Sequence, residues 1–130
     1  MKRILVIEDE EALREDLVDL LRGAPEGYEV LEAPEGRTGL ALIETQRPDL
    51  VICDRLMPAM AGHEVLEAIR ARHPELAPMP FVFLSALTDA SDREAVAPLE
   101  PALYLAKPID HRALLRVVAG LLGLRRRGLS

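Results

Sequence analysis

Four short apolar runs in this chain each end at a different polar group, and they constrain the fold more than any other feature. The runs are residues 4–7 before Glu8 and Asp9, 50–53 before Asp54, 81–84 before Ser85, and 103–106 before Lys107. Runs this short and rich in β-branched or aromatic residues are typical of strands buried on both faces of a parallel sheet. Because the carboxyl ends of parallel strands meet at one edge, we expect these polar groups to share one crevice.

Helical patterns separate the apolar runs. The predicted helices span about residues 10–22, 35–46, 62–73, 91–97 and 110–124, and a less apolar edge strand is expected at 28–33. Pro98 and Pro101 would end the fourth helix early, because an interior proline removes a backbone donor and clashes with the preceding turn. Five strands alternating with five helices through right-handed crossovers predict an α/β fold with a doubly wound sheet.

The composition fits one folded domain. Of the 130 residues, 49% are hydrophobic and 29% charged, and the net charge of -6 argues against a nucleic-acid surface. The single cysteine, Cys53, lies within an apolar run and has no internal partner, which suits a reducing cytoplasm. No apolar stretch approaches the ~20 residues of a membrane span. We therefore expect a cytoplasmic domain at residues 1–124, followed at 125–130 by a basic tail or the start of a linker.

The polar groups at the strand ends suit phosphoryl transfer. Glu8, Asp9 and Asp54 would place three negative charges close together, and a divalent cation would relieve their repulsion. Oxygen ligands of this kind favour a hard ion, Mg2+. A carboxylate beside such a metal can attack phosphorus and form an acyl phosphate. Lys107 would then neutralise charge on the phosphoryl group, and Ser85 would donate a hydrogen bond to it.

Each of these residues alone has a simpler explanation. Acidic residues after a strand often favour the start of a helix, a serine often caps a turn, and a lysine before a proline is often an ordinary loop residue. The conjunction of four strands that end in complementary groups is what favours a functional site.

From about Lys2 to Leu122, the sequence resembles the receiver domain of bacterial two-component response regulators. The motifs that carry the resemblance are ILVIEDE at 4–10, DLVICDRLMPAMAG at 49–62, FVFLSA at 81–86 and YLAKP at 104–108. The resemblance implies a flavodoxin-like doubly wound fold, in which a five-stranded parallel sheet of order 2-1-3-4-5 is flanked by five helices.

The resemblance also implies a role for each residue at the acidic end of the sheet. Asp54 would accept a phosphoryl group from a histidine kinase or phosphotransfer protein in a Mg2+-dependent reaction. Asp9 would ligate Mg2+ directly, Glu8 would help through water, and the backbone carbonyl of Leu56 would supply another ligand. The domain would be regulatory rather than an enzyme acting on a free substrate, although it would assist its own phosphorylation and dephosphorylation.

The remaining implied residues belong to a switch. Lys107 and Ser85 match the lysine and the switch hydroxyl of the family, and Tyr104 matches its rotating aromatic. Phosphorylation would draw Ser85 inward and let Tyr104 turn, which would change the surface of the fourth helix, fifth strand and fifth helix. The sequence departs from the family at 98–103, where two prolines stand, and at Ile109, where phenylalanine is frequent.

The fifth helix is apolar over about half of its circumference, which is wider than the ~100° stripe that one sheet face requires. Its apolar residues are Leu114, Leu115, Val117, Val118, Leu121 and Leu122. We expect this surface to form a phosphorylation-dependent homodimer or to dock an output partner. The alternative is that neighbouring helices cover it.

Two other functions fit the predicted fold. A small Mg2+-dependent phosphohydrolase is disfavoured, because Leu56 stands where haloacid-dehalogenase-type phosphatases place a second aspartate. A flavodoxin-like cofactor binder is disfavoured because the acidic crevice would repel a flavin phosphate and the chain has no tryptophan to stack on the ring.

Overall fold

Five parallel strands form one sheet in the order β2-β1-β3-β4-β5. The computed structural model describes residues 1–85 and 103–128, with side chains up to residue 123. The strands are β1 Arg3–Ile7, β2 Glu29–Ala33, β3 Leu50–Asp54, β4 Phe81–Ser85 and β5 Leu103–Ala106. The described helices are α1 Glu11–Arg22, α2 Gly36–Gln46, α3 Gly62–Arg72, the short 3-10 helix η1 Pro74–Leu76, and α5 His111–Gly128. The predicted sheet and strand order are confirmed.

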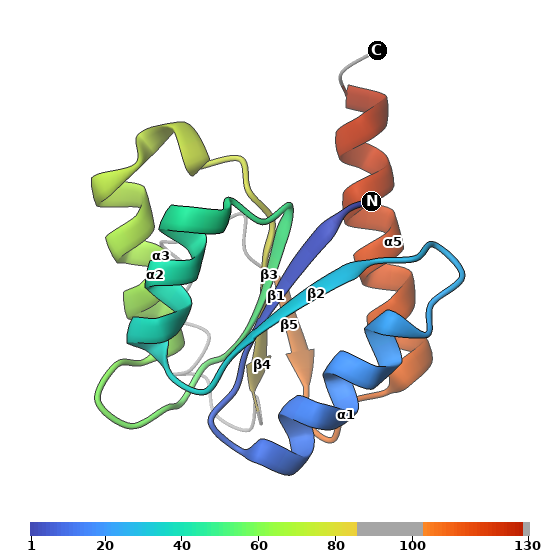
Figure 1. The fold of residues 1–130 in the computed structure, drawn as a ribbon, viewed down its shortest axis with the longest axis horizontal. Helices are drawn as coiled ribbons and strands as arrows, with labels where there is room; N and C mark the ends of the chain where they lie inside the picture. Colours follow the sequence, from blue (N-terminus) through green and yellow to red (C-terminus); the bar gives the residue numbers. More distant parts are fainter. Residues whose placement is uncertain (86–102, 129–130) are drawn as a thin grey trace.

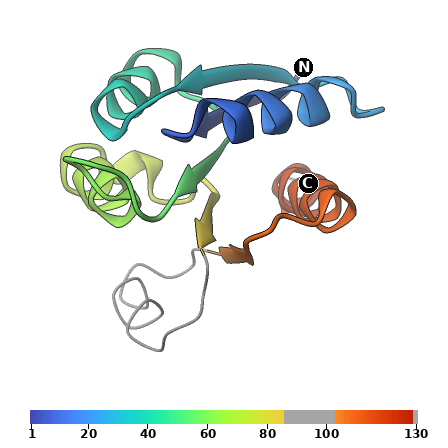
Figure 2. The same ribbon diagram turned by 90° about the horizontal axis from the view of Figure 1, so that it is seen from below.

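Helices cover both faces of this sheet (Figure 1). The helices α2 and α3 lie on one face, and α1 and α5 lie on the other, with the strands between them (Figure 2). In β1, Leu5 and Ile7 join the core on the α2 and α3 side, whereas Ile4 and Val6 join the core on the α1 and α5 side. All four side chains are buried, which explains why the strand is a continuous apolar run rather than an alternating one.

The structure differs from the sequence prediction in a few places. The short helix η1 was not predicted, and α5 continues to Gly128, past the predicted end at 124. Arginine is a good helix former, and cations near a helix C-terminus complement its dipole, which favours the extra turn. The predicted fourth helix at 91–97 and the two prolines after it lie outside the described residues. No helix in the described segments is long and apolar enough to cross a membrane.

Part of the wide apolar surface of α5 is used within the fold. Leu114, Val118 and Leu122 are buried against the sheet. The remaining three apolar residues predicted for the surface are partly buried and pack against the same core: Leu115, Val117 and Leu121. The surface left for a partner is therefore narrower than the sequence pattern suggested.

Helix α2 packs against β1 at a glycine. A Cβ atom at Gly39 would collide with the side chain of Ile7, whereas a Cβ at Gly120, in α5, would meet nothing within 4 Å. The close contact at Gly39 brings α2 against the strand that ends at the acidic pair, so this glycine is needed for packing and not for a special backbone conformation.

We predict opposite effects of alanine at these two glycines. Gly39→Ala should lower the free energy of unfolding by about 1–3 kcal/mol, because the core must shift to accept a methyl group. Gly120→Ala should raise it by up to about 1 kcal/mol, because alanine favours an exposed helix. Urea unfolding followed by circular dichroism measures both. Equal stability of Gly39→Ala and the parent would contradict the packing argument.

Candidate functional site

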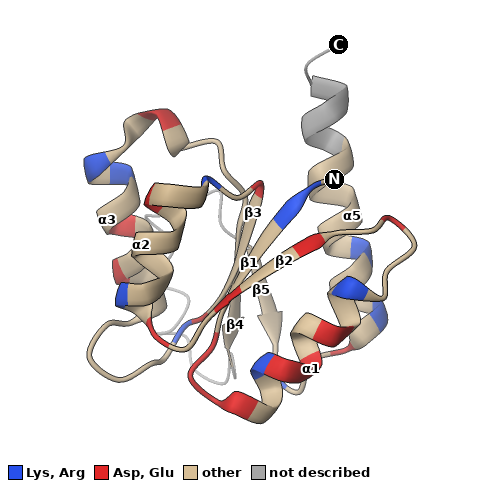
Figure 3. Cartoon of the chain, in the orientation of Figure 1, with Lys and Arg blue, Asp and Glu red and all other residues tan. Residues whose placement is uncertain are grey.

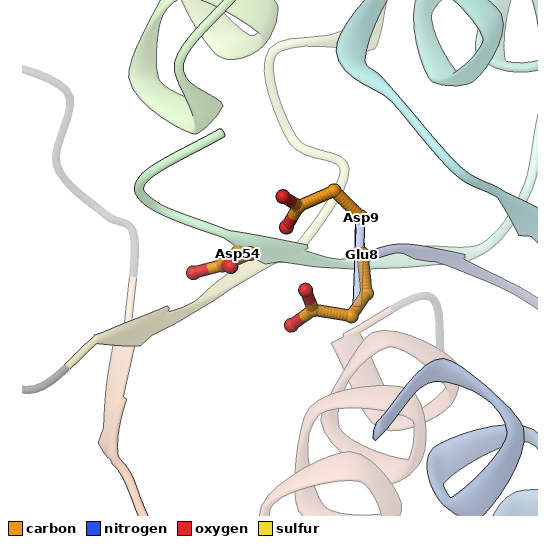
Figure 4. A group of neighbouring side chains, drawn as sticks. All are labelled: Glu8, Asp9 and Asp54. Atoms are coloured by element: carbon orange, nitrogen blue, oxygen red, sulfur yellow. The ribbon is translucent and has the colours of Figure 1, made fainter. Parts of the chain in front are cut away.

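The topology brings five predicted site residues to one edge of the sheet. Glu8 and Asp9 follow β1, Asp54 ends β3, Ser85 ends β4 and Lys107 follows β5. Strands β1 and β3 are neighbours with Ile7 opposite Cys53, which sets the acidic pair beside Asp54. The carboxylate oxygens of Glu8, Asp9 and Asp54 offer one ligand atom each within 4.8 Å of one another (Figure 4). Three carboxylates from two strands therefore form a candidate cation site.

Glu8 is the most deeply buried member of this acidic cluster. Its side chain is 0% exposed, and its Oε2 accepts a hydrogen bond from the backbone N–H of Glu10 at 2.9 Å. Within the described chain, Oε1 accepts no hydrogen bond and lies 3.6 Å from Nζ of Lys107. The pKa of Glu8 is raised to about 7, mainly by burial; the hydrogen bond from the Glu10 N–H lowers it, the nearby Asp9 and Asp54 raise it, and the charge of Lys107 lowers it. A buried carboxylate oxygen without a hydrogen bond suits a cation.

Lys107 supplies the positive charge of the site. Its Nζ lies 3.2 Å from Oδ2 of Asp54, a buried residue that is 5% exposed. Partial burial lowers the pKa of Lys107, but the negative charge of Asp54, together with that of Glu8, outweighs this, so its pKa is raised overall. Lys107 is thus held as a cation beside both carboxylates.

Backbone hydrogen bonds hold the ends of β3, β4 and β5 together. The N–H of Lys107 donates to the carbonyl of Ser85 at 2.8 Å, and the N–H of Arg55 donates to the carbonyl of Leu84 at 3.0 Å. Ser85 is buried at the end of β4. The ladder therefore places Ser85 and Lys107 on neighbouring strands next to Asp54.

Leu56 lies beside Asp54, and Tyr104 lies in β5 next to β4. The backbone N–H of Leu56 donates to Oδ1 of Asp54 at 3.4 Å, and the Leu56 side chain is 63% exposed. Tyr104 is partly buried in β5, where its ring centroid lies 6.3 Å from that of Phe83. The aromatic contact ties the tyrosine to the strand that carries Ser85.

Gly62 shapes the loop after Asp54, and sequence reasoning gave it no role beyond starting a helix. Its N–H donates to the carbonyl of Arg55 at 2.9 Å. A Cβ atom there would collide with the carbonyl oxygen of Asp54. In the same loop Ala59 has a φ of 68°, in the left-handed region that non-glycine residues rarely adopt. The loop can fold back on Asp54 only because residue 62 has no side chain.

Cys53 takes no part in this site. It is fully buried beside Asp54, and burial raises the pKa of its thiol well above the ordinary range. A thiol in this state is a small apolar residue rather than a nucleophile.

The raised pKa of Glu8 predicts a specific pH dependence for the metal-free protein. The folded chain holds a proton on Glu8 that the unfolded chain has lost between pH 4.5 and about 7, so the free energy of unfolding should fall as the pH rises through this window. Glu8→Gln should remove this part of the decline. Urea unfolding in EDTA at several pH values measures the difference. Parallel pH profiles for the parent and Glu8→Gln would contradict it.

Comparisons with known proteins agree with this geometry. A family model described as the response regulator receiver domain matches residues 4–119. The response regulator protein FleR of Pseudomonas aeruginosa is 40% identical over 119 residues, covering 90% of this chain and 24% of FleR. The response regulator MprA of Mycolicibacterium vanbaalenii is 38% identical over 120 residues, covering 92% of this chain and 50% of MprA. The chain thus spans about a quarter to a half of the length of these curated relatives.

The fold is also similar to that of a solved receiver domain. A CheY-like response regulator receiver domain protein from Methanospirillum hungatei JF-1 is 28% identical, with a TM-score of 0.86 over 98% of each chain. Its match extends over both helical layers and the sheet between them, and therefore includes the edge where the acidic cluster lies.

Proposed function

Because this chain belongs to the response regulator receiver domain family, we propose that Asp54 is the residue that receives the phosphoryl group. The observation that carries the proposal is the position of its carboxylate, 3.2 Å from the ammonium group of Lys107 and clustered with Glu8 and Asp9. This arrangement joins a nucleophile, a fixed cation and two further acidic ligands at one point. The family match identifies the chain as a receiver domain of two-component systems. The roles of the individual residues are our proposal.

The donor set of the acidic cluster fits Mg2+. It consists of carboxylate oxygens, and one of them, Oε1 of Glu8, is buried without a hydrogen bond. Asp9 and Asp54 would hold the ion directly, Glu8 would hold it through water, and the Leu56 carbonyl would complete the protein ligands. When bound, Mg2+ would supply positive charge for the phosphoryl oxygens and reduce repulsion among the carboxylates.

The chain's own residues divide the remaining work. An oxygen of Asp54 attacks the phosphorus of a phosphohistidine, an O–P bond forms, and the P–N bond breaks as the imidazole of the donor leaves. Lys107 neutralises charge on the transferred group, and the Ser85 hydroxyl donates a hydrogen bond to one of its oxygens. Water later attacks the phosphorus and regenerates the Asp54 carboxylate. The domain therefore assists both steps without acting on a free substrate.

The donor in this scheme is a histidine kinase or phosphotransfer protein, and the output passes through β5 and α5. Tyr104 packs near Phe83, on the strand that ends at Ser85, so a shift of Ser85 toward the phosphoryl group is transmitted to the exposed side of the sheet edge. Residues 1–124 form the receiver domain in this proposal, and the basic residues 125–127 that follow lie within the last turn of α5, which ends at Gly128. A cytoplasmic setting follows from the kinase partner.

A phosphohydrolase acting on a free substrate has no support among the relatives, which are response regulators. Residue 56 also lacks the second carboxylate that such a mechanism would use, because it is a leucine.

Incubation with acetyl phosphate and Mg2+ tests the acceptor. The parent should gain a base-labile phosphoryl group detected by intact-protein mass spectrometry, and Asp54→Asn should gain none. Asp16→Asn, an exposed change in α1, is the matched control and should behave as the parent. Equal labelling of Asp54→Asn, or labelling of the parent in EDTA, would defeat the proposal.

Sedimentation velocity tests the output surface. With beryllofluoride and Mg2+ the parent should shift from monomer toward dimer, because the exposed edge of β5 and α5 changes when Asp54 is occupied. Asp54→Asn should stay monomeric under the same conditions. An unchanged monomer at high concentration in both states would exclude the homodimer and leave an output partner as the use of this surface.

A further inference from the structure

The backbone carbonyl of Glu8 has a hydrogen-bond partner that the proposed mechanism does not use. The ladder of β1 ends at Ile7, although the N–H of Glu8 still reaches the carbonyl of Ala33 at 3.0 Å. The carbonyl of Glu8, which follows the last residue of β1, makes no hydrogen bond to a neighbouring strand in the described part of the chain. Nη1 of Arg14 donates to it at 2.8 Å. A buried carbonyl without a partner costs free energy, so this contact accounts for a group that the sheet leaves unpaired.

Two further hydrogen bonds hold Arg14 in place, one made by its side chain and one by its backbone. Its Nε donates to Oε1 of Glu32 in β2 at 3.1 Å, and its side chain is only 14% exposed. Its backbone N–H, in the first turns of α1, donates to the carbonyl of Glu10 at 2.9 Å. The planar guanidinium thus spans from α1 to β2 and meets the Glu8 carbonyl on the way. Such a clamp has little freedom to move.

The carbonyl of Glu8 belongs to the peptide group that joins Glu8 to Asp9. The orientation of this peptide group therefore determines the direction in which the Asp9 side chain extends from the backbone. Asp9 is exposed, and burial does not hold its side chain. We propose that Arg14 is a positioning residue, which fixes the Glu8–Asp9 peptide and thereby sets the two acidic ligands against Asp54. This inference rests on the proposed Mg2+ site and assigns a residue that sets its geometry.

The charge of Arg14 acts in the opposite direction to its hydrogen bond. Helix α1 is rich in acidic residues, and Arg14 and Arg22 are its basic ones (Figure 3). A cation near three carboxylates repels Mg2+, so loss of the charge alone would tighten metal binding. Loss of positioning would weaken it. The sign of the change in Mg2+ affinity therefore separates the two roles.

The experiment compares Arg14→Met with a matched control, Arg3→Met, in the full chain. Arg3 makes the same kind of contacts at the other edge of the sheet: Nη1 donates to the carbonyl of Gln46 at 2.9 Å, and Nη2 pairs with Glu29 of β2 at 3.4 Å. Isothermal titration with Mg2+ should show a Kd about tenfold higher for Arg14→Met, the effect typical of losing a group that orients a metal ligand. Arg3→Met should keep the parental Kd.

Further measurements distinguish failure of the inference about Arg14 from failure of the proposed function. At Mg2+ concentrations well above the weakened Kd, labelling of Arg14→Met by acetyl phosphate should recover, as expected of positioning and not of lost chemistry. An unchanged or lower Kd in Arg14→Met would overturn the inference while leaving the proposed function intact. A parent that binds no Mg2+ would overturn both the inference and the proposed function.

If Arg14→Met does not fold, Arg14→Lys serves as a second variant. Lysine keeps the positive charge but cannot bridge the Glu8 carbonyl and Glu32, so the Kd for Mg2+ should rise about threefold. A parental Kd in Arg14→Lys would overturn the inference.

Discussion

The structure depends on the mutual repulsion of three carboxylates that the sheet holds at the ends of β1 and β3. Glu8, Asp9 and Asp54 offer oxygens within 4.8 Å, and one of these side chains is fully buried. Such an arrangement is unfavourable without positive charge. Lys107, which follows β5, supplies part of that charge, and the negative charges of Asp54 and Glu8 raise its pKa. The site is thus poised to bind a cation, because binding relieves an electrostatic cost built into the fold.

The surrounding fold holds these groups in place against that repulsion. The central strands β1, β3 and β4 are buried on both faces, so their ends cannot move apart without disrupting the core. Close packing at Gly39 and Gly62 brings α2 against β1 and folds the loop back on Asp54. Arg14 secures the peptide between the two acidic residues from a third direction. In the proposed function, this rigid support is what would let an added phosphoryl group cause movement at β5 rather than only a local adjustment.

The sequence predicted the sheet well because its signal is local. Each strand is a short apolar run between helical patterns, and the order 2-1-3-4-5 followed from the family resemblance. The helix ends were less predictable: η1 depends on a turn after His73, and α5 runs beyond 124 through residues that resembled a tail. The apolar face of α5 was overestimated as free surface, since Leu115, Val117 and Leu121 pack partly against the core. Periodicity shows which residues are apolar and not which neighbour covers them.

By itself the sequence determined which chemical groups stand at the strand ends, because a polar residue that closes an apolar run is visible in one dimension. It also named Asp54, Lys107 and the acidic pair as the residues to consider. Only the tertiary structure decided that Glu8 is buried while Asp9 is exposed, that Lys107 lies nearer to Asp54 than to Glu8, and that Arg14 reaches the Glu8 carbonyl. Burial, distance and pKa depend on how separate elements meet, and an arginine in a helix carries no mark of the carbonyl it will contact.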